Sequence, residues 1–257
     1  MDERADNLER KIDKRKLREK RSEDQSVVES VFDTETQKII YQLYNRKILD
    51  EIEFVIATGK EANVYYAIGP KGEDFAVKIY RIKTAETRFM WPYIIGDPRF
   101  KNIRHKTRDL IFAWAEKEFK NLSRAKSAKV RVPTPIAVRK NVLVMEFLGN
   151  SYPDSPFPYP LLKDSCVQPQ KTYAQLIENI KILYQSAKLV HGDLSEFNIL
   201  NKNSSPIIID LSHAISTLSP ASHELLQRDI ANICRFFNKK GLKLSPAQIY
   251  GEITKGK

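Results

Sequence analysis

The sequence predicts an α+β fold, with strands gathered before residue 147 and helices dominating after it. Short apolar runs, separated by turns that contain Gly or Pro, recur between residues 52 and 145 and are typical of antiparallel strands. Residues 173–187 and 225–237 instead repeat apolar side chains at helical spacing. A chain of 257 residues that is 42% hydrophobic can form one large domain or two lobes.

Bulk composition argues against some classes of protein. No apolar run approaches the roughly 18 residues that a membrane-spanning helix needs, and the first residues are charged rather than signal-like, so no membrane partner is expected. Cys166 and Cys234 fit no metal-binding spacing and are too few for a disulfide framework. These observations predict a cytoplasmic protein.

Positive charge is concentrated in one segment. The whole chain carries +11, and residues 81–131 hold 14 Lys and Arg against five Asp and Glu. Such a segment attracts polyanions, nucleic acid first. Four aromatic residues that can stack on bases are interleaved with the charges, namely Phe89, Trp91, Tyr93 and Phe100. The alternative is a solvated face that only keeps the protein soluble.

An amphipathic helix is predicted to begin near residue 33. Asp33 and Thr34 provide a helix start, with Gln37 in the capping-box position. The apolar side chains that follow share one helical face, namely Ile39, Ile40, Leu43 and Tyr44. We expect this helix to pack on the body of the protein. Residues 1–26 have little periodicity and are expected to form an exposed or frayed helix.

Three strands are predicted next, over residues 52–56, 64–68 and 74–80. The loop at 57–63 between the first two is rich in small residues, which let backbone amides approach phosphates. The third strand carries Lys78, which points into a cleft if the opposite, apolar strand face packs on another element. The alternative is a lysine on the solvent face of an edge strand.

A helix over residues 110–122 follows, with Glu118 at the edge of its apolar face and Glu116 exposed. The long segment 83–107 separates this helix from the third strand, and a loop of that length is usually functional or mobile. Further strands are predicted from their apolar runs at 136–138 and 142–145. The segment 150–171 is rich in Pro and aromatic residues and is expected to be irregular.

The stretch from residue 189 to residue 210 carries the candidate chemistry. Asp193 can accept a proton from an attacking hydroxyl, and Asn198 offers an amide oxygen five positions later. Asp210 ends an apolar run and offers a carboxylate. A base beside oxygen ligands for Mg²⁺ is what phosphoryl transfer requires. The alternative is ordinary turn residues, since His-x-Asp is a common string.

These residues also carry a resemblance. His191-Gly192-Asp193 with Asn198 resembles the protein-kinase catalytic loop, with Gly in place of the usual Arg, and Asp210 resembles the metal-binding Asp that follows it. The longer strings His-Gly-Asp-Leu-Ser-Glu-Phe-Asn (191–198) and Thr-Gly-Lys-Glu-Ala (58–62) are similar to the RIO family of atypical protein kinases. The long insertion, with no winged-helix domain before residue 50, is similar to the first RIO subgroup.

The resemblance implies a truncated, two-lobed protein-kinase-like fold. Its parts are an N-terminal helical extension (1–48), a β-rich N-lobe (49–147) with the basic insertion 83–107, and a helical C-lobe (148–257). The family implies ATP with Mg²⁺ or Mn²⁺, phosphorylation of a serine in a protein or in itself, or ATPase turnover. It also implies association with maturing small ribosomal subunits and their RNA.

Site roles are implied residue by residue. Asp193 corresponds to the catalytic base, Asn198 and Asp210 to metal ligands, and Asp210 also to a nucleophile that can itself be phosphorylated. The remaining matches are to the nucleotide: Lys78 to the α- and β-phosphates, Glu118 to the orientation of Lys78, Thr58 and Lys60 to the phosphate loop, and backbone groups of Glu146 and Leu148 to adenine. Asp229 is expected either to hold the catalytic loop or to be exposed, and His213 stands where the family has Gln.

Two other functions remain open. Small-molecule phosphotransferases, which act on aminoglycosides or choline-like alcohols, also use His-Gly-Asp, a following Asn and a later Asp. The short segment after Asp210 leaves them little room for a substrate pocket. An RNA-binding assembly factor, gated by ATP and with incidental kinase activity, is the third reading.

Overall fold

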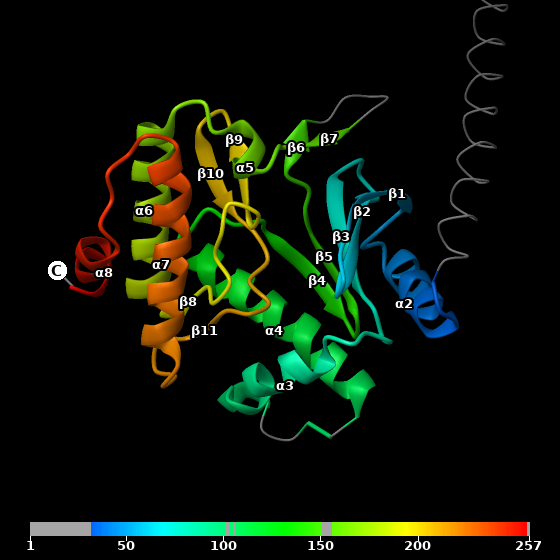
Figure 1. Cartoon of the computed structure of the whole chain (residues 1–257). Coiled ribbons are helices and arrows are strands. Elements are labelled where there is room, and N and C mark those ends of the chain that lie inside the picture. Colours follow the sequence, from blue (N-terminus) through cyan, green and yellow to red (C-terminus); the bar gives the residue numbers. More distant parts are fainter. Residues whose placement is uncertain (1–31, 101–102, 105, 151–155, 256–257) are drawn as a thin grey trace, which may run out of the picture.

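The computed structural model describes residues 32–100, 103–104, 106–150 and 156–255. The helix expected over residues 1–26 lies outside this range. Figure 1 shows a twisted sheet on one side, a group of helices with short strands on the other, and one long helix, α4, running between them. The expected α+β architecture, with a β-rich part followed by a helical part, is therefore confirmed.

The sheet is antiparallel throughout, in the order β1-β2-β3-β5-β4. Its strands are β1 (Glu51–Thr58), β2 (Ala62–Ile68), β3 (Asp74–Tyr80), β4 (Pro135–Arg139) and β5 (Val142–Glu146). All five predicted strands are present. Because β3 lies at the centre, Lys78 pairs with Val64 on one side and Leu143 on the other, so the exposed edge-strand alternative is wrong.

Helix α2 (Thr34–Asn45) covers one face of the sheet (Figure 1). The Asp33 side chain caps it by accepting hydrogen bonds from the backbone N–H groups of Glu35 and Thr36. Residue 36 is therefore the third helical residue, and Gln37 is not in the capping-box position. The buried residues of α2 pack with Val77 and Ile79 of β3. This contact occupies the apolar face of β3 and turns Lys78 to the opposite side.

The insertion 83–107 is not simply a long loop. It contains helix α3 (Thr87–Ile95) and the short 3₁₀ helix η1 (Pro98–Phe100), and both lie near α4 (Thr107–Ser127). Met90, Ile94 and Phe100 are buried in the cluster that α3 forms with α4. Phe100 is therefore a core residue and is not available to stack on a base, whereas Phe89 is exposed.

The helical part is built on α6 and α7, which lie side by side in Figure 1. Its elements are β6 (Gly149–Asn150), β7 (Phe157–Pro158), α5 (Leu162–Ser165), α6 (Pro169–Gln185), β8 (Leu189–Val190), β9 (Ile199–Lys202), β10 (Ser205–Ile208), β11 (Ile215–Ser216), α7 (Ser222–Lys239) and α8 (Pro246–Thr254). The segment expected to be irregular thus holds a small hairpin and a helical turn. Pro220 lies two residues before the start of α7.

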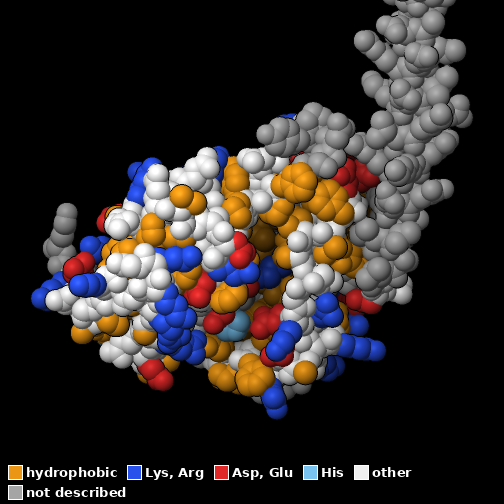
Figure 2. All heavy atoms as spheres, turned by 45° about the horizontal axis from the view of Figure 1, so that its top comes forward, with side chains coloured by type: hydrophobic (Ala, Val, Ile, Leu, Met, Phe, Trp, Pro, Cys, Tyr) orange, Lys and Arg blue, Asp and Glu red, His pale blue; other side chains and the backbone are white. Residues whose placement is uncertain are grey.

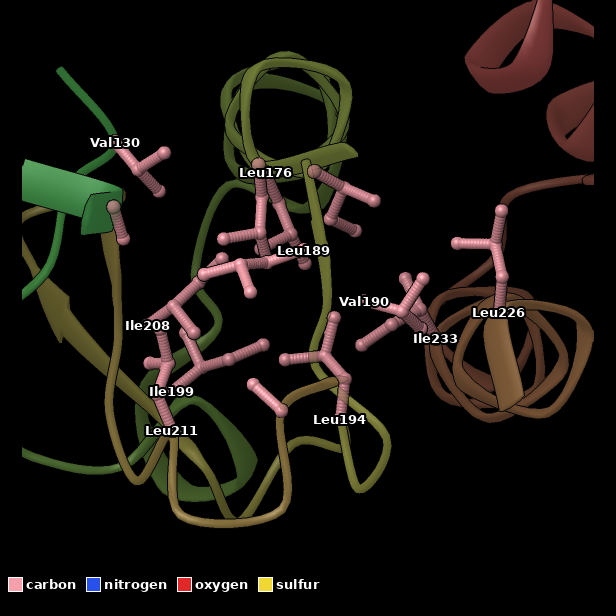
Figure 3. Packing of buried hydrophobic residues seen from close by; sticks show 14 of the residues in the cluster. Val130, Leu176, Leu189, Val190, Leu194, Ile199, Ile208, Leu211, Leu226 and Ile233 are labelled. Carbon is pink, nitrogen blue, oxygen red and sulfur yellow. The ribbon is translucent and has the colours of Figure 1, made fainter. Parts of the chain in front are cut away.

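The main core lies directly beneath the candidate catalytic segment. Figure 3 shows side chains of that segment converging with those of α6 and α7. Leu189, Val190, Leu194, Ile199 and Leu211 are all buried, and each such side chain stabilises the fold by about 1.5–3 kcal/mol. The pairing of β8 with β11 and of β9 with β10 adds backbone hydrogen bonds on both sides of the loop. The segment that carries the polar candidates is therefore rigidly supported.

Two features of the described residues bear on the expectations from composition. None of the helices formed by these residues combines the length and the apolar character needed to cross a membrane. Cys166 and Cys234 are free thiols rather than a disulfide.

Candidate active site

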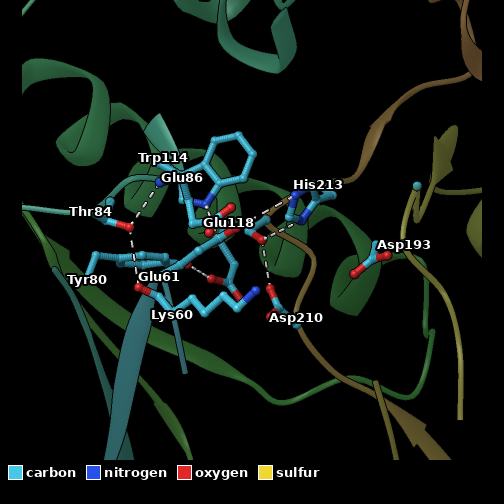
Figure 4. Close-up of polar contacts among 12 residues, drawn as sticks. Lys60, Glu61, Tyr80, Thr84, Glu86, Trp114, Glu118, Asp193, Asp210 and His213 are labelled. Carbon is cyan, nitrogen blue, oxygen red and sulfur yellow. Dashed lines mark hydrogen bonds and ion pairs between the residues drawn. The ribbon is translucent and has the colours of Figure 1, made fainter. Parts of the chain in front are cut away.

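Lys78 connects two carboxylates that come from distant parts of the chain. Its Nζ lies 2.9 Å from Oε2 of Glu118 on α4 and 2.9 Å from Oδ1 of Asp210. The hydroxyl of Tyr80, on the same face of β3 as Lys78, donates a short hydrogen bond to Glu118. Figure 4 shows Glu118 and Asp210 close together, with Asp193 on a neighbouring segment of chain. The structure therefore brings together three of the residues predicted from the sequence.

The charges of this group determine its protonation. Burial raises the pKa of Glu118 to about 7, because desolvation outweighs the attraction of Lys78. Burial would also raise the pKa of Asp210, but the Lys78 ammonium holds it well below its usual range. Burial alone would lower the pKa of Lys78, yet the carboxylates of Asp210 and Glu118 raise it above its usual value. Lys78 is therefore charged, and Glu118 is the carboxyl that takes up a proton first.

Asp210 has an unusual backbone conformation. Its φ angle is 60°, in the left-handed region, which Asp tolerates better than most residues. The Ser212 hydroxyl donates to Oδ1 at 2.7 Å, the same oxygen that Lys78 binds. None of the described residues bonds to Oδ2. Non-glycine residues with positive φ concentrate at functional sites, and here the conformation leaves one carboxylate oxygen available to a ligand.

The loop that bears Asp193 is held by two side chains of the same stretch, those of Asn198 and His191. The Asn198 side-chain amide donates to the Asp193 carbonyl at 2.7 Å and to Asp193 Oδ2 at 3.2 Å. The Asp193 N–H donates to Nδ1 of His191, so the ring proton is on Nε2, which donates to the Ile209 carbonyl at 3.0 Å. His191 therefore links the loop to the residue before Asp210.

Asp229 holds the same loop from α7, and the exposed alternative is wrong. Its two carboxylate oxygens accept hydrogen bonds from the Gly192 and Leu194 backbone N–H groups, both at 2.8 Å. Asp229 itself is buried. Arg228 and Asn232 donate to the carbonyls of the same two loop residues. The backbone N–H groups and carbonyls of Gly192 and Leu194 thus all find hydrogen-bond partners on one helix, α7.

Gly192 explains why Arg is absent at this position of the motif. Its φ is +81°, and a Cβ there would lie 2.9 Å from the backbone oxygen of His213. Gly192→Ala is expected to lower the unfolding free energy by at least about 1–2 kcal/mol through the left-handed conformation alone. That corresponds to a melting temperature lower by roughly 2–8 °C. Gly251→Ala is the control, because nothing lies near its Cβ; an equal loss in both variants would contradict this account.

The oxygen donors fit a divalent cation. The Ile209 N–H donates to the Asn198 carbonyl at 3.0 Å, so the chain positions of Asn198 and Asp210 are tied together. Since the Asn198 amide nitrogen is used by Asp193, its Oδ1 is the group left for a cation. The described residues contain no group of three His, Cys, Asp or Glu that could hold a metal. A Mg²⁺ site completed by water and substrate phosphates, with only one or two carboxylates, agrees with this donor set.

Thr58 and Lys60 of the predicted phosphate loop lie outside the described contacts of Lys78, Glu118 and Asp210. Thr58 ends β1 and pairs with Asn63, and the Gly59 N–H donates to the Ala62 carbonyl at 2.9 Å to close the turn. A Cβ on Gly59 would lie 3.1 Å from that carbonyl oxygen. The Lys60 side chain is exposed, and its carbonyl accepts from the Thr84 hydroxyl. Contacts between described residues therefore do not connect Lys60 to the group formed by Lys78, Glu118 and Asp210 (the Lys78 group).

The predicted adenine-binding segment lies at the end of β5. The Glu146 N–H donates to the Thr134 carbonyl, and the Leu148 carbonyl accepts from the Tyr159 N–H. The Leu148 N–H has no partner among the described residues. The Glu146 side chain instead accepts from Thr134 and is not directed to the Lys78 group. Figure 2 shows one face of the molecule with a hollow in which acidic and basic side chains meet, bordered by hydrophobic ones.

Sequence reasoning missed several polar residues of the site. Tyr80 and Ser212 contact the two carboxylates, and Glu61 accepts from the Trp114 indole while lying 4.0 Å from His213. Figure 4 shows His213 and Trp114 beside this group. A signal was present for one of them, because Tyr80 falls on the same strand face as Lys78.

The sequence of the chain is similar to a known domain family and to several named proteins. A family model described as RIO domain matches residues 63–249. A relative from Haloferax volcanii, named RIO-type serine/threonine-protein kinase Rio1, is 40% identical over 257 residues, covering 98% of this chain and 87% of its own. A relative of the same name from Methanocaldococcus jannaschii is 41% identical over 251 residues, covering 96% and 84%.

The chain belongs to the RIO family. The names of both relatives support a RIO-type kinase of the Rio1 kind, as the sequence motifs predicted. Among solved structures, this RIO chain is similar to the Rio2 kinase from Chaetomium thermophilum, at 24% identity and a TM-score of 0.62. A second structure of that kinase, described as an ADP/Mg²⁺-phosphoaspartate complex, has a TM-score of 0.58. The chain covers 65% and 63% of these two structures and shares their fold.

Proposed function

We propose that this RIO chain is an ATP-dependent serine/threonine kinase in which Asp193 is the catalytic base and Asp210 and Asn198 hold Mg²⁺. The observation that carries the proposal is the bridge of Lys78 between Glu118 and Asp210, beside the loop on which Asn198 orients Asp193. A cation held between two carboxylates and next to a base suits the positioning and charge neutralisation of phosphoryl transfer.

Each residue has a defined task in this proposal. Lys78 binds the α- and β-phosphates, and Glu118 keeps its ammonium in place. Asp193 accepts the proton of the attacking hydroxyl, and its orientation is fixed by Asn198. Mg²⁺, when bound, neutralises charge on the phosphates. Backbone groups of Glu146 and Leu148 bind adenine, and the loop that holds Thr58 and Lys60 covers the phosphates.

Asp210 is also proposed as an acceptor of the phosphoryl group. A carboxylate oxygen forms a bond to the γ-phosphorus as the bond from that phosphorus to the β-phosphate oxygen breaks, and ADP leaves. Water then cleaves the acyl phosphate to release phosphate, which gives ATPase turnover. The Asp210 oxygen that no described residue contacts supports this role, as does the description of the related Rio2 kinase structure.

The deciding experiment is incubation of the chain with γ-labelled ATP and Mg²⁺, followed by hydroxylamine. Label on protein that resists hydroxylamine supports transfer to serine, and label that hydroxylamine removes supports transfer to Asp210. Label that appears only as free phosphate supports ATPase turnover. Both transfers should stop with excess chelator. No consumption of ATP under any of these conditions would reject the proposal.

A role in small ribosomal subunit maturation, in the cytoplasm, is part of the same proposal. It is supported by the net charge of +9 over residues 81–131. Co-sedimentation with small-subunit precursors, with and without ATP, tests it, and no association in either state would argue against it. The small-molecule phosphotransferase alternative is tested by offering aminosugars and choline-like alcohols as acceptors.

A further inference from the structure

One stripe of helix α4 holds the residues that follow Asp210. Trp114, Lys117, Glu118 and Asn121 have the spacing i, i+3, i+4 and i+7, so they lie on one helical face. Glu118 contacts the Lys78 group described above. The other three contact the chain directly after Asp210, which belongs to a different part of the fold.

Lys117 is the unusual member of this stripe. Its side chain is completely buried, and its Nζ donates to the carbonyls of Ser212 and Ala214, both at 2.6 Å. None of the described carboxylates lies within ion-pair distance of it. Burial lowers the pKa of Lys117 to about 7. Even the neutral amine keeps two N–H groups, one for each carbonyl.

Asn121, one helical turn after Lys117, hydrogen-bonds to the same segment. Its side-chain amide donates to the carbonyls of Leu211 and Ala214, at 2.9 and 3.0 Å. Together with Lys117 it therefore fixes the carbonyls of three of the four residues after Asp210. A short chain segment held at three carbonyls has little freedom to change the φ angle of the residue that precedes it.

Residues of the insertion also contact Asn121 and Lys117. Arg99 donates to Asn121 Oδ1 at 2.9 Å and is itself paired with Asp97, so the Asn121 amide is held in one orientation. The Tyr93 and Trp114 rings lie 5.7 and 5.3 Å from Lys117 Nζ. The same two rings pack edge-on against His213. Helix α3, the turn after it and Trp114 of α4 thus cover the buried Lys117 Nζ.

We propose that Lys117 is a positioning residue for Asp210. By holding the backbone of residues 211–214 against α4, it keeps the Asp210 backbone in the left-handed conformation that presents the carboxylate to Lys78 and to Mg²⁺. The insertion that carries Asp97 and Arg99 serves as the outer brace. This inference rests on the proposed function, because it assigns the anchored carboxylate to a metal.

The test is Lys117→Met, which keeps the unbranched side chain and removes its donors. Mg²⁺ is titrated into the protein with ADP, and ADP binding is also measured in chelator. Loss of an outer-shell partner weakens metal binding by about 10–100-fold, so the Mg²⁺ midpoint should rise by that factor while ADP binding in chelator stays within about twofold. Lys120→Met, which removes a half-buried lysine that pairs with the exposed Glu116 on the same helix, is the matched control.

A purely structural role for Lys117 predicts a different result, namely a lower melting temperature with an unchanged Mg²⁺ midpoint. A folded Lys117→Met protein with the wild-type midpoint would overturn the inference. If that variant does not fold, Asn121→Ser and Arg99→Met each remove a smaller part of the hydrogen bonding to residues 211–214 and its support. Both should raise the Mg²⁺ midpoint by at least threefold. An unchanged midpoint in both would also overturn it.

A second readout separates the inference from the proposed function. Backbone deuterium exchange over residues 211–216 should become faster in Lys117→Met and stay unchanged in Lys120→Met. If wild-type ADP binding does not respond to Mg²⁺, the proposed metal site fails, and the exchange result alone decides whether Lys117 anchors the segment. Unchanged exchange in Lys117→Met would show that it does not.

Discussion

Replacing Asp193 by asparagine is expected to lower kcat for phosphoryl transfer by about 10²–10⁴-fold, the usual contribution of a general base. Asparagine keeps the shape of the side chain and can still accept the hydrogen bond that Asn198 donates to Asp193 Oδ2. Because the loop is held from α7 by Asp229, its backbone should not move. The affinity for ATP should therefore change by less than about threefold, since the base acts on the acceptor hydroxyl rather than on the nucleotide.

The measurement is the initial rate with γ-labelled ATP, together with nucleotide affinity by calorimetry and the melting temperature. Asp164→Asn is the matched control, because Asp164 is an exposed carboxylate whose ion pair among the described residues is with its neighbour Lys163, and the rate of this variant should be that of the wild type. A wild-type kcat for Asp193→Asn would move the role of base to another residue. A loss of ATP binding in parallel with kcat would mean that Asp193 supports the nucleotide instead.

Much of the fold could be predicted because local signals were unambiguous. The strand at 74–80 was predicted to the residue, since alternation of its side chains is bounded by a turn at Gly72 and by polar residues after Tyr80. Of the candidate site, the residues that belong to the recognisable motifs could be predicted. Asp193, Asn198 and Asp210 lie in one short stretch whose spacing limits what they can do.

Other features depend on contacts that no local pattern encodes. Helix α3 contains Pro92 and lies in a basic segment, so its sequence does not suggest a helix, and it is stabilised by packing on α4. Lys117 stands between two glutamates, which is typical of an exposed helix surface. Its burial follows only from the position of the chain after Asp210, which arrives from the other half of the fold.

Lys78→Met is expected to have the largest effect on stability as well as on nucleotide binding. The substitution removes the cation that both Glu118 and Asp210 contact. Removing one partner of a buried ion pair destabilises a protein by about 3–5 kcal/mol. The loss assigned to Asp210 is smaller, because its side chain is 39% exposed, so the main contribution comes from Glu118, which is 1% exposed. Lys163→Met, at an exposed pair, should change stability by less than about 1 kcal/mol.

The pH dependence of this loss follows from the pKa of Glu118. In the folded wild type that pKa is raised from 4.5 to about 7, so the carboxyl destabilises the fold as pH rises through this window. Lys78 lowers the pKa of Glu118 and of Asp210, and both values should therefore increase in the variant. The folded variant then takes up protons at acidic pH, which relieves the unpaired charge. The difference in melting temperature between wild type and variant should accordingly be smaller at pH 5.5 than at pH 8, where it should be on the order of 10 °C.

Adding Glu118→Gln to Lys78→Met isolates the pair. The double variant has no buried carboxylate on α4 to desolvate, so it should be more stable than Lys78→Met at pH 8, and its deficit should vary little between pH 5.5 and 8. Thermal melts of the wild type, both single variants and the double variant at the two pH values give the coupling free energy directly. A Lys78→Met deficit that is the same at both pH values would mean that Glu118 carries no uncompensated charge in the folded protein, and the electrostatic account of the site would then be wrong.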